Sequence, residues 1–143
     1  MAIRRKSRAT LTALVAIGLL TSCAPARTDV SIDGITVSAE LANTPERQQK
    51  GLSGRVDLLA DQGMLFELGE PQNTEVWMFG VQIPLDVVWI RDGRVLRVDT
   101  LNPCVSDIES ECQRTPSPGE IDTILEAGAG VFAHVQPGTR VDR

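Results

Sequence analysis

The sequence predicts a mostly β fold, a compact β-sandwich or barrel-like domain with one or two short helices. Short segments that are apolar or alternate in polarity recur along the chain, with turn residues between them. Asp92-Gly93 separates two such segments by two residues, which is a strong β-hairpin signal. This spacing favours a sandwich or barrel over a βαβ arrangement, and 143 residues fit one domain.

The N-terminus, residues 1–22, is predicted to be a lipoprotein signal peptide. A basic stretch, MAIRRKSR, precedes an apolar run over residues 9–20 that is too short to span a membrane. The run leads into Leu20-Thr21-Ser22-Cys23, which resembles the bacterial lipoprotein box whose Cys is lipidated. The alternative is an ordinary signal peptide that is cut nearby and leaves Cys23 as a free thiol.

Lipidation of Cys23 implies an exported protein that is anchored to the bacterial cell membrane, periplasmic or on the outer surface. Residues 23–34 would then be the lipidated Cys and a tether, and residues 35–143 a single β-rich domain. From Cys23 onward, 10 basic residues face 19 acidic ones, a net charge of −9. We therefore expect no nucleic-acid partner, because such binding depends on Lys and Arg that neutralise phosphates.

The first half of the domain is predicted to hold strands around one helix. Ile35 to Leu41 alternates apolar and polar residues, as a half-buried strand does. Thr44 as N-cap and Pro45 at the first helical position predict a helix from Pro45 to about Lys50, which stops at Gly51. Two short apolar runs suit buried strands, namely 64–66 and 76–79.

The second half is predicted to begin with a hairpin, formed by Leu85 to Arg91 and Arg94 to Leu101. Residues 102–119 contain three Pro and one Gly, which predicts a long loop without regular structure. A strand is expected from Ile121 to Glu126 and a helical turn over Gly128 to His134. Pro137-Gly138 then predicts a turn before a last short strand around Arg140-Val141.

Cys104 and Cys112 are predicted to form a disulfide. They remain as a pair once Cys23 is assigned to the lipid, and exported chains fold in an oxidising setting. The other interpretations are free or redox-active thiols and a metal thiolate pair, although this spacing without a nearby His is poor for zinc.

The motifs that would indicate catalysis are incomplete. Gly51-Leu52-Ser53-Gly54-Arg55 lacks the second Gly of a nucleophile elbow, since Arg55 stands in its place. His134 could act as a general base, but a lone His in an apolar stretch more often packs. We predict no catalytic residue.

Residues that could bind metals have ordinary explanations as well. Three alternating carboxylates in the Cys104–Cys112 loop could hold Ca²⁺, but a solvated acidic loop explains them too; they are Asp107, Glu109 and Glu111. Met64 and Met78 could bind a soft metal, but core packing also accounts for them. We therefore predict no metal site and no cofactor.

Arg55 and Asp86 are the charged residues of most interest, because both stand beside strongly apolar neighbours. Burying either one alone is costly, so we expect them to pair. The pair could be structural, or Arg55 could bind an anion or hydroxyl at the mouth of a pocket with Trp77 as an apolar wall. The predicted binding residues are Arg55, Trp77, Met78 and Asp86.

A series of short stretches then follows in a specific order along the chain: Thr44 to Arg47, Gly51 to Arg55, Gly63 to Phe66, Trp77-Met78, Ile83 to Asp86, Gly93 with Val95, Pro103-Cys104 and Ile124 to Gly128. In order and spacing, this series resembles the domain of unknown function family 192 (DUF192) over about residues 35–142. The resemblance implies a compact β-rich fold and no established reaction. Where the family usually has Lys-Asn after Trp-Met, this chain has Phe79-Gly80.

We therefore expect a membrane-anchored envelope lipoprotein whose β-rich domain binds a ligand or partner without catalysis. Its partners would be the membrane, through the lipid anchor, and an unknown small molecule, glycan or envelope protein. One alternative is a hydrolase-like enzyme that uses Arg55, Asp86 and His134. The other is a structural envelope assembly factor without a ligand.

Overall fold

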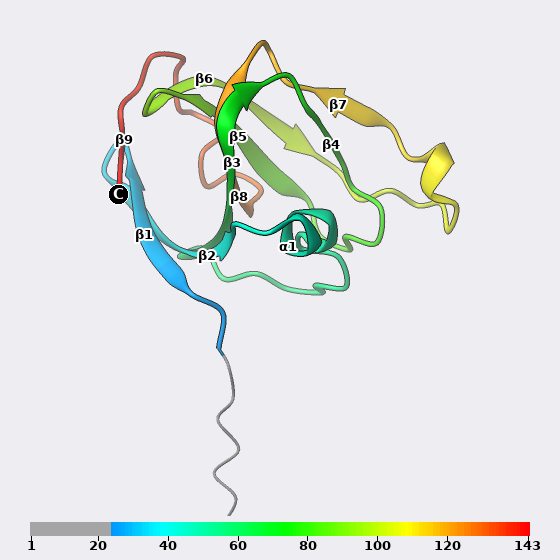
Figure 1. Ribbon diagram of the computed structural model, residues 1–143. Helices are drawn as coiled ribbons and strands as arrows, with labels where there is room; N and C mark the ends of the chain where they lie inside the picture. Colours follow the sequence, from blue (N-terminus) through cyan, green and yellow to red (C-terminus); the bar gives the residue numbers. More distant parts are fainter. Residues whose placement is uncertain (1–23) are drawn as a thin grey trace, which may run out of the picture.

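The computed structural model describes residues 24–143, which form a strongly curled sheet flanked by a second, small one (Figure 1). The elements are, in chain order, β1 (Arg27–Ile32), β2 (Ile35–Ala42), α1 (Pro45–Lys50), β3 (Gln62–Gln72), β4 (Glu75–Trp77), β5 (Leu85–Arg91), β6 (Arg94–Leu101), the 3₁₀ helix η1 (Glu109–Glu111), β7 (Arg114–Pro116), β8 (Ile121–Gly128) and β9 (Val141–Asp142). The predicted signal peptide and the lipidation of Cys23 lie outside the described residues. No helix in the described part is long and apolar enough to cross a membrane.

The prediction of a mostly β fold is confirmed. Within residues 24–143, seven strands form one sheet in the order β6-β5-β8-β3-β2-β1-β9, and β4 pairs with β7. The pairings are antiparallel except for one, because β2 and β3 run parallel. The connection between β2 and β3 contains α1. The fold therefore has one parallel β-α-β crossover, although the sequence favoured a sandwich or barrel without a βαβ arrangement.

Several elements have the predicted bounds and the predicted local causes. α1 spans Pro45–Lys50, and the side chain of Thr44 accepts a hydrogen bond from the backbone N–H of Arg47 at 3.4 Å. The hairpin of β5 and β6 turns at Asp92 (φ 50°) and Gly93 (φ 68°). Both φ angles are positive, as the tight turn between twisted antiparallel strands requires.

The prediction of an irregular loop over residues 102–119 is wrong, because the segment contains η1 and β7. Pro116 lies at the end of β7, in a two-stranded sheet where a missing N–H costs little. The predicted Cys104–Cys112 disulfide is present, with 5.6 Å between the two Cα atoms. It closes the segment that leads into β7.

The N-terminal boundary of the domain also differs from expectation. β1 lies inside residues 23–34, where a tether was expected, and pairs along its whole length with β2. The sheet therefore begins before residue 35, and only residues 24–26 precede it in the described chain. Residues 129–134 form turns where a helical turn was expected, and β9 begins at Val141, where the last short strand was expected.

The two faces of the large sheet bury two separate clusters of apolar side chains. One cluster contains Leu65, Leu125 and Phe132. The other contains Phe66 and Ile124. Figure 1 shows α1 and the β4–β7 pair on the same side of the curled sheet. Leu52, just after α1, and Met78, just after β4, pack into the second cluster, so these elements cover that face.

Candidate functional site

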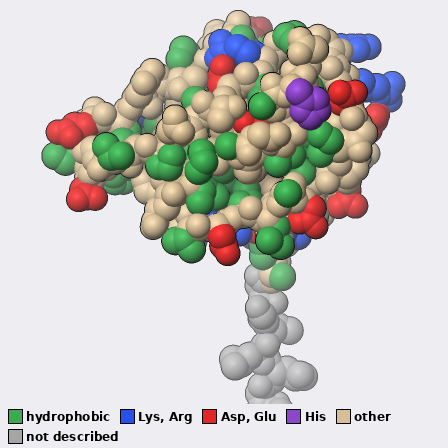
Figure 2. All heavy atoms as spheres, turned by 180° about the vertical axis from the view of Figure 1, so that it is seen from behind, with side chains coloured by type: hydrophobic (Ala, Val, Ile, Leu, Met, Phe, Trp, Pro, Cys, Tyr) green, Lys and Arg blue, Asp and Glu red, His purple; other side chains and the backbone are tan. Residues whose placement is uncertain are grey.

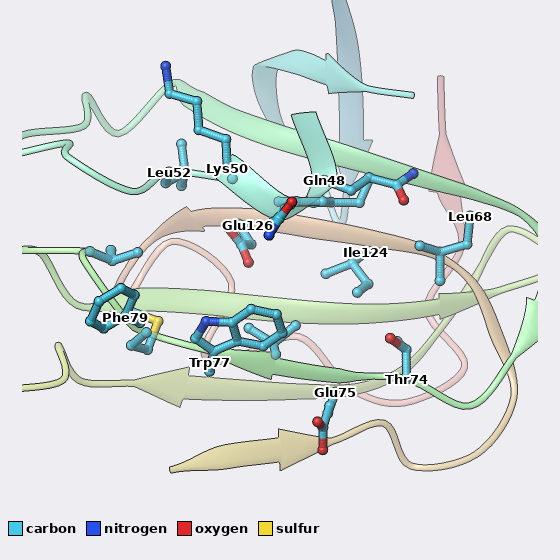
Figure 3. Close-up of a pocket in the computed structure, with 16 residues that line it drawn as sticks. Gln48, Lys50, Leu52, Leu68, Thr74, Glu75, Trp77, Phe79, Ile124 and Glu126 are labelled. Carbon is cyan, nitrogen blue, oxygen red and sulfur yellow. The ribbon is translucent and has the colours of Figure 1, made fainter. Parts of the chain in front are cut away.

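A groove of about 380 Å³ lies between this covered face of the sheet and the elements that cover it (Figure 3). Side chains from α1 and the turn after it form one wall, β4 and the residues after it form another, and β3 and β8 form the floor. Most of the lining is apolar, and the apolar members are Leu52, Phe66, Leu68, Val76, Trp77, Met78, Phe79, Val81 and Ile124.

Glu126 is the buried carboxyl of this groove. In β8 it stands opposite Met64 of β3 and opposite Val87 of β5. Side chains that are directly opposite in a sheet share a face, so the register turns Glu126 toward the groove with Met64 and Val87. Glu126 is 6% exposed and lines the cavity (Figure 3).

Burial without a charged partner changes the acidity of Glu126. Desolvation raises the pKa of its carboxyl from 4.5 to about 7, because the charged form loses its water shell. No other cause contributes to this pKa, and no ion pair within the described residues involves the side chain. Near neutral pH, the groove therefore holds a carboxyl that can gain or lose its proton.

The other two buried carboxylates of the described chain have partners. Glu40, which is 8% exposed, accepts hydrogen bonds from Arg27 at 2.7 Å and from Arg55 at 2.5 Å. Asp86, which is fully buried, accepts from the backbone N–H groups of Gly130 at 2.9 Å and Phe132 at 2.8 Å. Glu126 differs from both because no charged partner faces its carboxyl, which lines the groove.

Close packing of β3 against β8 depends on Gly63. A Cβ atom at this position would lie 2.5 Å from the carbonyl oxygen of Glu126, closer than real Cβ atoms approach. Gly63 thus permits the pairing that holds the backbone of Glu126 in place. The glycine is needed here for close approach rather than for an unusual φ angle.

Trp77 forms an aromatic wall of the groove. It is half-buried in β4, and its cross-strand partner is Arg114 of β7. The guanidinium carbon of Arg114 lies 4.2 Å from the centre of the indole ring, within cation–π distance. Arg114 also donates to Glu75 at 2.9 Å and is not among the residues that line the groove.

Of the four predicted binding residues, Trp77 and Met78 line the groove together. Arg55 lines a neighbouring hollow of about 580 Å³ on the other side of Gly51, with Glu40 and Lys50. Asp86 lies elsewhere, since it follows Leu85 and precedes Val87 in β5 and so projects from the opposite face of the sheet.

The predicted pairing of Arg55 with Asp86 is therefore wrong. The two side chains lie on opposite faces of the sheet, and each forms hydrogen bonds with other residues. Arg55 bonds to Glu40, and the second oxygen of Asp86 accepts from the hydroxyl of Thr100 at 2.7 Å. Asp86 secures the turn after β8 to β5 and is a structural residue.

The trio considered for a hydrolase is not assembled either. Arg55 and Asp86 lie on opposite faces of the sheet, and His134 is exposed on the surface (Figure 2). Within residues 24–143, no group of three or more His, Cys, Asp and Glu side chains is placed to hold a metal ion.

Glu126 is the site residue that the sequence analysis did not single out. Its signal is a charged residue in the middle of an otherwise apolar run, Ile124-Leu125-Glu126-Ala127. Strand alternation alone allows such a residue to face water, and only the register against β3 and β5 and the cover from α1 and β4 bury it.

Comparisons with known proteins agree with the fold. The model of the DUF192 family, described as "Uncharacterized ACR", matches residues 28–143. A crystal structure of a protein of unknown function from Novosphingobium aromaticivorans is 27% identical with a TM-score of 0.74, and the match covers 95% of this chain and all of that one. A proposed transcription regulator from Sinorhizobium meliloti is 27% identical with a TM-score of 0.71, covering 82% and 94% of the two chains. No curated protein matches significantly.

Replacing Asp86 tests its structural role. Asp86→Ala removes the acceptor of two backbone N–H groups, so we expect the free energy of unfolding to fall by about 2–4 kcal/mol. Asp107→Ala, in an exposed loop, is the control and should change it by less than about 0.5 kcal/mol. Chemical denaturation measures both variants, and equal, small effects would show that Asp86 does not hold the turn.

Replacing Glu126 tests the cost of its burial. The raised pKa means that the folded protein binds a proton more tightly than the unfolded chain, so stability falls as pH rises from about 4.5 to about 7. Glu126→Gln removes this loss. Relative to wild type, its free energy of unfolding should rise by about 3 kcal/mol between pH 4 and pH 8.

Urea denaturation at both pH values measures this gain. The control is Glu70→Gln, which neutralises an exposed carboxylate of β3 and should show no comparable change. A Glu126→Gln difference that is the same at pH 4 and pH 8 would contradict the burial of an unpaired carboxyl.

Proposed function

The chain belongs to the DUF192 family, and we propose that its β-rich domain binds a small ligand in the groove beside Glu126, as the non-enzymatic binding part of a membrane-anchored envelope lipoprotein. The observation that carries this proposal is the unpartnered buried carboxyl in a mainly apolar cavity. Sites for small molecules typically combine apolar walls with a few polar groups that orient the ligand.

The groove suits recognition of a small molecule with an apolar body. Its volume of about 380 Å³ falls in the range of ligand pockets. Trp77 offers a flat apolar surface, and the stacked Arg114 together with the β4–β7 pairing holds that ring in place. A wall that is already rigid loses little conformational freedom when a ligand binds.

The proposed anchor is the lipid on Cys23, which the lipoprotein box in the sequence supports. Three residues, 24–26, separate Cys23 from β1, so the anchor would hold the sheet close to the membrane surface. An extended segment of this length spans only about 10 Å. In this proposal the protein is exported and lies on the periplasmic or outer side of the membrane.

This proposal includes no nucleic-acid partner, although the similar Sinorhizobium meliloti protein is described as a proposed transcription regulator. From Cys23 onward the chain carries a net charge of −9. Such a body repels phosphates unless a basic surface counters the repulsion.

Binding of 2-phenylethanol tests the groove. This neutral aromatic probe should raise the melting temperature of the protein, since it stabilises the folded state by mass action. Trp77→Ala should weaken its binding about tenfold, because the largest apolar wall is lost. Ile108→Ala, an exposed apolar residue outside the groove, should leave binding unchanged. Stabilisation that survives Trp77→Ala, or no stabilisation of wild type by either this probe or its amine analogue phenethylamine, would contradict the proposal.

The anchor has a separate test. Cys23→Ala should abolish incorporation of labelled lipid and remove the protein from the detergent phase of envelope extracts, since the thiol that accepts the lipid is missing. Ser22→Ala keeps the thiol and a small residue before it, so lipidation should persist. Normal lipid labelling of Cys23→Ala would show that the anchor is elsewhere or absent.

A further inference from the structure

We propose that the groove selects ligands that carry a protonated amine, with the ammonium bound by the Glu126 carboxylate beside the Trp77 indole and the apolar part of the ligand along the groove. This inference rests on the proposed function, because it names the chemical class of ligand for the same site.

Glu126 lacks the cation or N–H donors that would stabilise its charged form. A buried carboxylate ordinarily has a cation or several N–H donors, as Glu40 and Asp86 do in this protein. Glu126 is equally buried and has neither. A ligand with a positively charged N–H donor would supply the missing partner of the carboxylate. The resulting hydrogen bond would be charge-assisted and therefore stronger than one between neutral groups.

The aromatic wall of the groove also favours a cation. Glu126, in the floor formed by β8, and Trp77, in the wall formed by β4, line the same groove (Figure 3). Aromatic faces attract cations through the ring quadrupole, and an ammonium group between a carboxylate and an indole gains from both. The remaining apolar lining suits the hydrocarbon part of an organic amine.

The other charged groups around the groove are directed away from Glu126 or held by partners. Lys50 of α1 lines it, but its side chain extends away from Glu126 in Figure 3. Glu75 of β4 also extends away and pairs with Arg114. On β2, Glu40 is held by Arg27 and Arg55. The neighbours Met64 and Val87, on β3 and β5, carry no charge. The Glu126 carboxylate is therefore the charged group that faces a ligand bound in the groove.

The test compares two probes of the same shape, phenethylamine and 2-phenylethanol, by calorimetry at pH 8. The amine should bind wild type about ten- to a hundredfold more tightly than the alcohol, the value of one charge-assisted hydrogen bond. Glu126→Gln should remove this preference and leave the affinity for the alcohol within about twofold. Glu70→Gln, outside the groove, should keep it.

A second measurement needs no variant. The pKa of Glu126 lies at about 7, so the carboxylate that binds the ammonium is largely protonated at pH 5.5. The amine itself stays protonated, because its pKa is about 10. Without the carboxylate the amine keeps only the affinity of its apolar part, so its affinity for wild type should fall about seven- to twentyfold from pH 8 to pH 5.5, whereas the affinity for the alcohol should stay constant.

The outcomes separate the two proposals. Equal affinity of both probes for wild type, or an amine preference that survives Glu126→Gln or does not change with pH, overturns the amine inference but leaves the groove as a binding site. Failure of both probes to bind wild type overturns the proposed function itself.

Discussion

The register of β8 between β3 and β5 is the constraint on which the candidate site depends. β8 lies in the interior of the seven-stranded sheet, and both of its pairings place Glu126 in line with apolar side chains of its neighbours. A shift by one residue would turn Glu126 to the opposite face. The close approach at Gly63 allows β3 to lie against Glu126, and α1 and β4 then close the face into a groove.

The three buried carboxylates of residues 24–143 differ in whether they have protein partners, and this difference indicates function. Glu40 joins β1 and β2 to the segment after α1 through two guanidinium groups, and Asp86 holds the turn after β8. In both cases, these contacts offset the free-energy cost of burying the charge. Glu126 contributes none within the described chain and weakens the fold as pH rises from about 4.5 to about 7. A ligand that supplies the missing partner would explain why a carboxyl is buried at this position.

The sequence predicted the elements whose causes are local. Thr44 and Pro45 begin α1, and Asp92-Gly93 turns the hairpin, because caps and tight turns depend on adjacent residues. The parallel pairing of β2 with β3, the strand β7 and the early start at β1 depend on contacts with distant segments, so local patterns did not indicate them. Trp77 and Met78, which the sequence named as candidate binding residues, do line the groove. Contacts with distant segments also explain why the sequence did not single out Glu126 and paired Arg55 with Asp86 instead of Glu40.

The central claim, that Glu126 is a buried carboxyl without a protein partner, can be measured directly. A titration by ¹³C NMR of protein labelled at the Glu side-chain carboxyl carbons resolves its protonation, and Glu126→Gln assigns the resonance. The account predicts a midpoint near pH 7, well separated from the exposed glutamates. A midpoint near 4.5 would mean that the carboxyl is solvated or paired, and would contradict both the site and the proposed ligand class.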